Sequence, residues 1–369
     1  MKLSSRLLAA AASGLVSCAT VASASGVSYT CNADINSTAP GMCATLNSFV
    51  SGQYASLFSN ANASIYIEFN SGAGLGASTS GYFNQVSYST YYDALGTEAS
   101  AGPVNAAAYA SLPATEPGIY GGGLVELTSA LEGALGIGGG IGTTAPNPSD
   151  TTTLVSGSPC IPGSSGCYDG VIWLDTPAGL SSLTGGQGYY FGTGSGAANG
   201  QGGNDYGAYS VVEHETDEIL GTESCITTTT GSLHDECGGT SPSAVDLFRY
   251  QSSGNRVLVN TTPGAYFSYD GGVTNGADGA TYNTVANGND YADFNNEGCA
   301  MVQNGTGCTG ESQYITSDGG AEDNILQAVG YAPVESSNPV TPEPGTLTLL
   351  GSGLVGVAGL VRRRRKAKA

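Results

Sequence analysis

Residues 211–221 have the sequence VVEHETDEILG, and this stretch indicates which fold and which chemistry to expect in the protein. We predict a helix over residues 206–220 that ends at Gly221, because glycine commonly follows the last turn of a helix. Residues four apart on a helix share one face. His214 and Glu218 are therefore expected to lie side by side on this helix.

An imidazole and a carboxylate at this spacing can bind one metal ion together. Glu215 follows His214 directly, and a carboxylate that is not itself a ligand can activate a metal-bound water. The pattern follows the logic of the H-E-x-x-H helix of zinc peptidases, with Glu218 in place of the second histidine. We therefore predict His214 and Glu218 as zinc ligands and Glu215 as the catalytic base. This pair would bind zinc more weakly than two histidines and could favour a harder ion.

A zinc site of this kind needs three protein ligands and a water, so a third ligand must come from outside the helix. The candidates that follow the helix are His234, Asp235, Glu236 and Asp246. We favour His234, because it is the only other histidine and lies between Cys225 and Cys237, whose disulfide could hold it near the helix end. Asp246 is the alternative, although it could instead pair with Arg249. A His-Glu-x-x-Glu string also arises by chance, and an exposed acidic helix needs no metal.

The cysteines, with Cys18 set aside, fall in close pairs along the chain. An even number of cysteines in an exported protein argues for disulfides. The spacing suggests four local loops, although it leaves the connectivity open: Cys31–Cys43, Cys160–Cys167, Cys225–Cys237 and Cys299–Cys308. A zinc–thiolate site is disfavoured because no C-x-x-C spacing occurs. Serine or cysteine catalysis is also disfavoured, since the cysteines are committed to bridges and two histidines leave little choice of base.

The charges of the chain are unevenly distributed. The formal net charge is −20, and Arg249 and Arg256 are the only basic residues, histidines aside, between the two ends. Such a surface repels nucleic acid and anionic lipid, so both are excluded as partners. It could attract divalent cations, although solubility alone would also explain the composition. We considered calcium at residues 270–278, where the spacing fits no EF-hand loop.

The N-terminus has the features of a secretory signal peptide over residues 1–24. A basic start and a short apolar run precede the small-residue pattern ASA at residues 22–24, which is typical of a cleavage site. The apolar run is too short to span a bilayer. Residues 15–18 also resemble a lipobox, which would leave Cys18 as a lipidated N-terminus.

The C-terminus has three parts. A linker over residues 336–345 contains the motif Pro342-Glu343-Pro344, residues 346–361 form an apolar helix of marginal length for a membrane span, and residues 362–369 are basic and expected to stay cytoplasmic. This order resembles the PEP-CTERM sorting signal of Gram-negative bacteria. The resemblance implies recognition by an exosortase-type membrane enzyme, location in the cell envelope or outside the cell, and a link to exopolysaccharide or biofilm matrix.

The segment between the two ends, residues 25–335, is the predicted ectodomain. It contains most of the 58 glycines, and we expect it to be rich in loops. Helical and extended patterns are mixed along it, which predicts an α+β fold. We expect helices over residues 82–95, 124–135, 206–220 and 323–329, and strands over 63–69, 171–174, 245–250, 256–259 and 265–269.

The motifs around the helix resemble those of metzincin-type secreted peptidases. They are, in order, a strand, the turn LGAS at 75–78, the strand DGVI at 169–172, the helix itself and LQAVGY at 326–331. More closely, the chain resembles a family of PEP-CTERM-associated metalloproteases, through HETDEILG at 214–221, DLFRY at 246–250 and AYFSYDGG at 265–272. The resemblance spans about residues 60–332 and implies a metzincin-like domain. The chain departs from the metzincin pattern at Ser224, which stands where that pattern has its third ligand.

We therefore expect a secreted or surface-sorted, zinc-dependent endopeptidase. Its partners would be an exosortase-type sorting enzyme, a protein or peptide substrate and, in the envelope, exopolysaccharide. The alternative hypothesis is a non-catalytic acidic protein of the matrix or cell surface. That alternative includes a peptidase relative which has lost activity because it lacks a third ligand.

Overall fold

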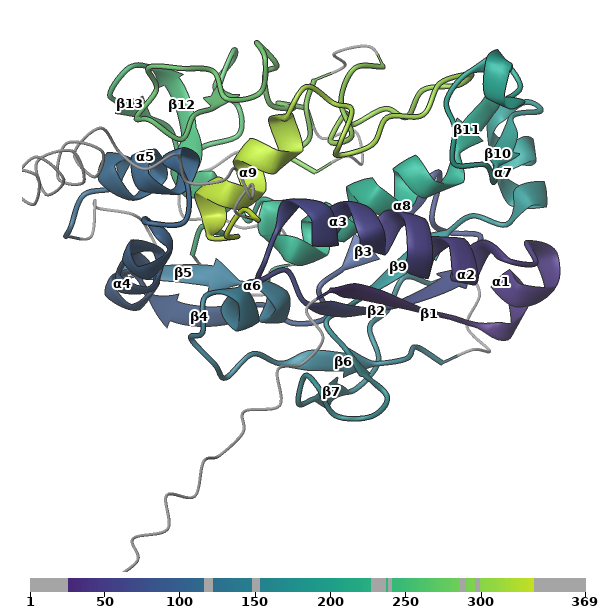
Figure 1. Cartoon of the computed structure of the whole chain (residues 1–369), viewed down its shortest axis with the longest axis horizontal. Helices are drawn as coiled ribbons and strands as arrows, with labels where there is room; N and C mark the ends of the chain where they lie inside the picture. Colours follow the sequence, from purple (N-terminus) through teal and green to yellow (C-terminus); the bar gives the residue numbers. More distant parts are fainter. Residues whose placement is uncertain are drawn as a thin grey trace, which may run out of the picture.

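A four-stranded sheet lies at the centre of the computed structural model, which describes residues 26–115, 122–147, 153–226, 237, 241–285, 290–295 and 299–334. The strands are ordered β1-β2-β9-β3, and their bounds are Val27–Cys31, Ala63–Phe69, Gly170–Leu174 and Gly76–Thr79. The first three run parallel, and β3 is an antiparallel edge strand. The structure is thus a mixed α/β fold with helices and loops above the sheet (Figure 1).

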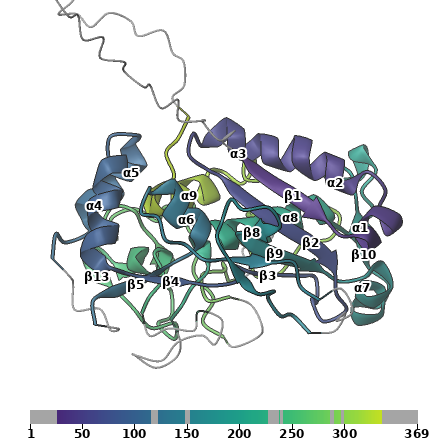
Figure 2. The ribbon, with the colours of Figure 1, turned by 90° about the horizontal axis from the view of Figure 1, so that it is seen from below.

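The strand residues explain their positions in this sheet. The inner strand β9 has the sequence GVIWL and is buried at every position, as expected for a strand covered on both faces. Its neighbour β2 pairs with it in parallel, with Ile67 opposite Ile172. Both strands were predicted from the sequence, and the structure confirms them. Figure 2 shows the sheet from below, with β2 and β9 between the two edge strands.

Two helices lie across one face of the sheet (Figure 1). They are α3 (Ser51–Leu57), which continues a π-helical turn at Leu46–Val50, and α8 (Ala208–Asp217), which continues into the π-helical turn Glu218–Thr222. The prediction of a helix over 206–220 is therefore confirmed, although its last turn is π-helical. A glycine in β3 allows α8 to approach closely, because a Cβ atom at Gly76 would lie 2.5 Å from Val211 Cγ1 and 2.7 Å from Glu215 Oε1.

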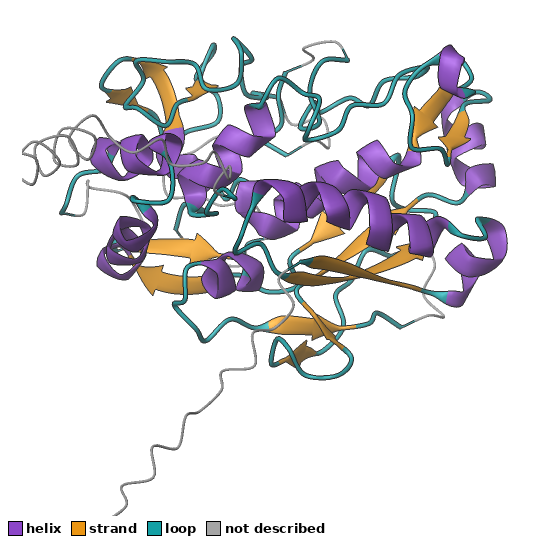
Figure 3. Cartoon of the chain, viewed as in Figure 1, coloured by secondary structure: helices purple, strands orange, loops and turns teal. Residues whose placement is uncertain are grey.

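The other elements surround this centre (Figure 3). The helices are α1 (Ala33–Thr38), α2 (Met42–Thr45), α4 (Tyr88–Glu98), α5 (Pro103–Ser111), α6 (Ser129–Ala134), α7 (Pro177–Thr184) and α9 (Ala321–Val329), with short 3-10 turns at Ala197–Asn199 and Val245–Phe248. The short strands are β4 (Asn84–Ser87), β5 (Leu124–Leu127), β6 (Gly142–Thr144), β7 (Pro159–Cys160), β8 (Cys167–Tyr168), β10 (Gly188–Tyr190), β11 (Asp205–Gly207), β12 (Arg249–Ser252), β13 (Asn255–Arg256) and β14 (Tyr266–Phe267). The predicted helix at 323–329 corresponds to α9.

Two of the predicted helices begin later than expected. The first residues of both segments form β4 and β5, which pair antiparallel with Val86 opposite Val125. The helices α4 and α6 start only after Ser87 and Thr128, whose side chains cap the first turns. The prediction of helix over 82–87 and 124–127 is therefore wrong. The backbone N–H and C=O groups of β4 and β5 are paired with each other, although the two strands are distant in sequence. An amphipathic pattern within one segment does not reveal such pairing.

The predicted strand over 245–250 is wrong in its first half. Residues Val245–Phe248 form a 3-10 turn, and β12 begins at Arg249. The turn forms because the Asp246 carboxylate accepts hydrogen bonds from the backbone N–H and hydroxyl of Ser243, which bends the chain at this point. The predicted strand over 256–259 is wrong except at Arg256, the last residue of β13, and the predicted strand over 265–269 is confirmed only at Tyr266–Phe267, which form β14.

The helix that carries the HExxE motif ends at a glycine with a left-handed backbone, as predicted. Gly221 has φ 116°, and a Cβ atom there would lie 3.0 Å from Leu131 Cδ2. We expect Gly221→Ala to lower the free energy of unfolding by about 1–3 kcal/mol, because other residues are strained in this conformation. Urea unfolding would measure it. The control is Gly52→Ala in α3, where nothing lies within 4 Å of a new Cβ atom and a small gain in stability is expected. Equal stability of both variants would contradict the prediction.

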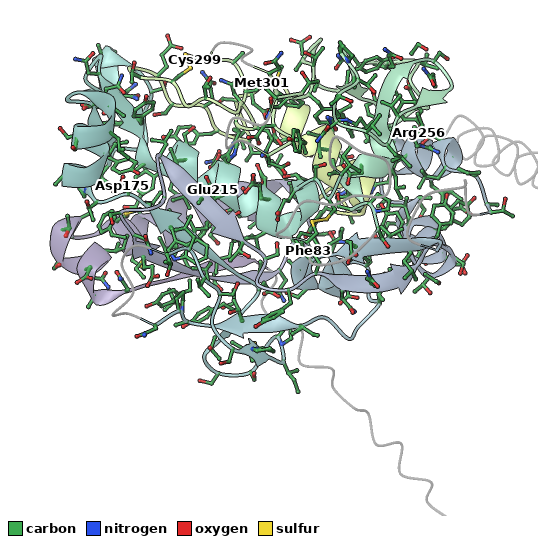
Figure 4. All side chains as sticks on the ribbon, turned by 180° about the vertical axis from the view of Figure 1, so that it is seen from behind. Phe83, Asp175, Glu215, Arg256, Cys299 and Met301 are labelled. Carbon is green, nitrogen blue, oxygen red and sulfur yellow. A yellow bond between two sulfur atoms is a disulfide. The ribbon has the colours of Figure 1, made fainter. Side chains whose placement is uncertain are left out.

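Four disulfides pin the loops of the structure. They join Cys31 to Cys43, Cys160 to Cys167, Cys225 to Cys237 and Cys299 to Cys308. Each bridge joins two cysteines that follow one another along the chain, as the spacing suggested. The first ties edge strand β1 to α2, and the last closes a loop above α8, where Figure 4 labels Cys299 and Met301.

The two ends of the chain lie outside the described residues. This applies to the expected signal peptide over 1–24 with Cys18, to the linker and sorting motif, to the apolar segment 346–361 and to the basic tail 362–369. Within the described part of the chain, no helix combines the length and the apolar character that a membrane span requires.

Candidate metal centre

Helix α8 presents the HExxE residues to a cavity of about 710 Å³. One wall is formed by residues 73–78, which include most of β3, and the opposite wall by segments between residues 290 and 313. The floor is α8, which contributes His214 and Glu215, together with the π-helical turn that follows it, which contributes Glu218. Figure 4 shows Glu215 on this helix in the middle of the molecule, beneath the loop that carries Cys299 and Met301.

A third side chain that could bind a metal ion, Asp293, joins His214 and Glu218 in this cavity. The Nε2 atom of His214 lies 3.7 Å from Glu218 Oε1 and 3.5 Å from Asp293 Oδ1. One ligand atom from each of the three residues lies within 4.8 Å of the other two, and this is the one such group among the described residues. One nitrogen and two carboxylate oxygens at these distances make a donor set that suits zinc or a harder divalent ion.

Each of the three side chains is oriented by a hydrogen bond. The Nδ1–H of His214 donates to the carbonyl oxygen of Val302 at 3.0 Å, since a carbonyl can only accept, and this leaves Nε2 as the free ligand atom. The Ser78 hydroxyl of β3 donates to Glu218 Oε2 at 2.6 Å. Asp293 Oδ1 accepts from Gln303 Nε2 at 3.1 Å. This pattern of outer contacts is typical of metal ligands, which are held in one orientation.

The protonation of the three groups is strongly coupled. Burial lowers the pKa of His214, but the carboxylates of Asp293, Glu215 and Glu218 outweigh it and raise this pKa to about 10. Burial raises the pKa of Glu218 to about 7, against the opposing effect of His214. Protons and a divalent cation therefore compete for the same atoms, and cation binding would release protons.

Glu215 lines the cavity without belonging to the group of three. Its side chain is 5% exposed and lies against Gly76 of β3. Burial raises its pKa well above the usual range, as does the adjacent Glu218 carboxylate, with which it shares a hydrogen bond. A carboxyl group with a raised pKa, next to a ligand set but outside it, is suited to accept and return a proton.

Of the predicted candidates for the third ligand, the structure describes only Asp246. His234, Asp235 and Glu236 lie outside the described residues. Asp246 is 1% exposed, and its two oxygens accept hydrogen bonds from the Ser224 hydroxyl, the Cys225 N–H and both the N–H and hydroxyl of Ser243. Its carboxylate therefore has a structural role in joining the end of the HExxE helix to the 3-10 turn, outside the group of three.

Ser224, which stands at the third-ligand position of the metzincin pattern, has an indirect role in the site. Its backbone N–H donates to Asp290 Oδ1 at 3.0 Å. Asp290 in turn donates its own N–H to Asp293 Oδ2 at 3.1 Å. The chain after the helix thus holds the segment that carries the third carboxylate, instead of supplying a ligand itself.

The segment considered for calcium, residues 270–278, is held by the chain itself. Asp270 Oδ1 accepts hydrogen bonds from the Ser268 hydroxyl and from the N–H groups of Val273 and Thr274. Several donors outweigh burial and lower the pKa of Asp270. These contacts describe a turn closed by an aspartate.

Asp293 was not found from the sequence because its distance along the chain from the helix follows no motif. The signal that points toward it is weak: Asp290 and Asp293 stand in the segment DYADFN at 290–295, where aromatic residues interrupt a run of glycine and asparagine. Only the fold brings this segment against α8. Gln303, Val302 and Ser78 were missed for the same reason.

Comparison with known proteins identifies the C-terminal end of the chain. Residues 340–365 match the PEP-CTERM protein-sorting motif. No curated protein and no solved structure matches the chain significantly. The chain therefore carries the sorting signal of PEP-CTERM proteins. This motif is a substrate signal for an exosortase-type sorting enzyme, and it implies export and membrane-anchored sorting.

Proposed function

We propose that this protein is an exported, metal-dependent peptidase. The observation that carries the proposal is the convergence of His214, Glu218 and Asp293 in a cavity that also contains Glu215 outside the ligand set. The sequence resemblance to metzincin-like, PEP-CTERM-associated metalloproteases agrees with this reading. The sorting motif agrees with a place of action in the cell envelope or outside the cell, where exopolysaccharide is a further candidate partner.

The residues present fit a zinc ion. Three protein ligands with an open side toward a cavity are the arrangement of catalytic zinc sites, and Ser78, Val302 and Gln303 orient the three ligands. A bound zinc ion would supply Lewis acidity toward a peptide carbonyl. The two carboxylates leave a harder divalent ion as a second candidate.

The remaining chemistry falls to residues of the chain. The Glu215 carboxylate, on the floor of the cavity, would take a proton from the attacking water and return it to the leaving amine. β3 forms one wall of the cavity and, among the described strands, pairs only with β9. Its other edge therefore offers backbone N–H and C=O groups to an extended peptide. This would place a peptide bond near His214 and Glu215.

The hypothesis of an inactive peptidase relative depended on the lack of a third ligand. Asp293 supplies a candidate for that ligand, which removes the main reason for this reading. The more general alternative, an acidic non-catalytic surface protein, predicts neither stoichiometric metal nor hydrolysis.

Metal analysis of the exported protein tests the proposal. We expect one zinc per chain by mass spectrometry and casein hydrolysis that a chelator abolishes. In Asp293→Asn, zinc affinity is expected to fall by at least about 100-fold, since loss of outer contacts alone costs 10–100-fold. The control is the same substitution at Asp278, which is exposed and does not line the cavity, so zinc affinity is expected to stay unchanged. A metal-free wild type, or equal zinc affinity in both variants, would refute the ligand set.

A further inference from the structure

The loop closed by the Cys299–Cys308 disulfide contacts two of the three candidate ligands through consecutive residues. The carbonyl oxygen of Val302 accepts the Nδ1–H of His214, and the side chain of Gln303 donates to Asp293. Cys299 and Met301 of this loop line the cavity together with Glu215, and Figure 4 shows both of them above Glu215. The loop therefore covers the site, and its contacts help to set the positions of the candidate ligands.

Gln303 is itself held from several directions. Its backbone N–H donates to Glu322 Oε1 of α9 at 3.0 Å, and its carbonyl accepts the N–H of Phe294 at 2.7 Å. The Thr222 hydroxyl donates to Gln303 Oε1 at 3.4 Å. The side chain is fully buried, and a carboxylate can only accept, so the amide must present its NH₂ group to Asp293. The position and the orientation of this donor are thus both determined by the fold.

The acceptor of this hydrogen bond is the atom that matters for a metal. Asp293 Oδ1 accepts from Gln303 and is also the oxygen that lies 3.5 Å from His214 Nε2. A donor at this atom restrains the rotation of the carboxylate and draws off part of its negative charge. We propose that Gln303 is a positioning residue of the metal centre, which acts through Asp293. This inference rests on the metal site of the proposed function.

A pair of matched substitutions tests this role. Gln303→Met keeps the length of the side chain and removes the donor, so zinc affinity is expected to fall by about 10–100-fold. Gln53→Met is the control, because Gln53 is also buried and donates to a carboxylate of the same helix, Glu213, which is not a candidate ligand. The zinc affinity of Gln53→Met is expected to stay within about threefold of wild type. This is well below the change expected when a hydrogen bond to a metal ligand is lost. Zinc dissociation constants are measured by competition with a chelating dye on the full exported protein.

A spectroscopic readout separates positioning from general stability. With cobalt(II) in place of zinc, the visible absorption spectrum reports the ligand arrangement, and we expect it to change in Gln303→Met but not in Gln53→Met. If Gln303→Met does not fold, as judged by circular dichroism, Gln303→Asn takes its place. That variant keeps the amide but is one methylene shorter, and the same loss of affinity is expected.

The outcomes distinguish this inference from the proposed function. If the wild-type protein binds neither zinc nor cobalt, the metal site is refuted, and the role of Gln303 with it. If the wild type binds zinc and Gln303→Met binds it equally well with an unchanged cobalt spectrum, the role of Gln303 alone is refuted. Equal losses in Gln303→Met and Gln53→Met would also refute it, because they would reflect general loosening of the buried interior.

Discussion

Replacement of Glu215 by glutamine is expected to lower kcat for peptide hydrolysis by about 10²–10⁴-fold, the usual contribution of a general base. Glutamine has nearly the same shape as glutamate but cannot accept the proton of the attacking water. The side chain lines the cavity beside Gly76 and lies outside the group of three candidate ligands. Zinc content should therefore stay at one ion per chain while the activity is lost.

The control for this experiment is Glu68→Gln on β2. Glu68 is also buried, but its carboxylate accepts a hydrogen bond from the Trp173 indole away from the cavity. The peptidase activity of Glu68→Gln should remain within about threefold of wild type, which is a small change compared with the loss of a general base. Two results would contradict the assignment. If Glu215→Gln retains activity, another group is the base, and if it loses zinc together with activity, Glu215 is a ligand.

The second large effect concerns the stability of the metal-free protein, which is expected to fall as the pH rises. Four buried carboxylates, here called the buried acidic cluster, lie on α8, in the turn before α9 and in the first turn of α9: Glu213, Asp217, Asp318 and Glu322. Burial raises the pKa of all four; repulsion from other members adds to this effect for Glu213, Asp217 and Glu322, and repulsion from Asp323 adds to it for Asp318. Asp318 reaches a pKa of about 6.

The sign of the pH dependence follows from these shifts. When the pKa is higher in the folded state than in the unfolded state, the folded protein holds more protons between the two values. The free energy of unfolding is then highest below about pH 4, the unfolded pKa of such groups, and falls as the pH rises through the folded pKa. For Asp318 this window ends near pH 6, and the raised pKa of each other member contributes a dependence of the same sign.

Urea unfolding in the presence of a chelator measures this dependence. Between pH 5 and 7 we expect the free energy of unfolding to fall by about 1 kcal/mol or more per pH unit, since one group contributes up to about 1.4 kcal/mol for each unit. A flat or rising profile over this range would show that the cluster does not retain its protons in the folded state.

Asp217→Asn identifies the cluster as the source of the effect. Asp217 Oδ1 accepts a hydrogen bond from the Tyr54 hydroxyl at 2.7 Å, while none of the described atoms donates to Oδ2. An amide keeps the first contact, can donate to a neighbouring carboxylate and carries no charge. Stability at pH 7.5 should therefore rise by about 1–3 kcal/mol, with a smaller gain at pH 5. Asp278→Asn, on the exposed surface, should leave the profile unchanged.

Local sequence patterns predicted the parts of the site that lie on one element. The helix, its end at Gly221 and the shared face of His214 and Glu218 all follow from spacing within a single segment. The buried strands β2 and β9 were recognisable in the same way, because strand-forming residues are concentrated in each of them. The close spacing of the cysteines indicated the four disulfide loops for the same reason.

The patterns failed where distant segments decide the local structure. Residues 84–87 and 124–127 form strands because they pair with each other, although each segment alone has a helical pattern. Asp246 was a reasonable third ligand by composition, but the donors of Ser224, Cys225 and Ser243 surround its carboxylate.

The sequence by itself therefore determined the HExxE helix, its terminating glycine, the pairs of cysteines and the sorting motif at the C-terminus, since each depends on residues close together in the chain. Only the tertiary structure decided that Asp293 joins His214 and Glu218, that Gln303 and Val302 hold two of these side chains, and that β3 lies along the cavity. A metal site needs donor atoms within a few ångströms of one another. When the donors come from remote segments, no local pattern specifies that distance. It is set by the packing of the loops onto α8.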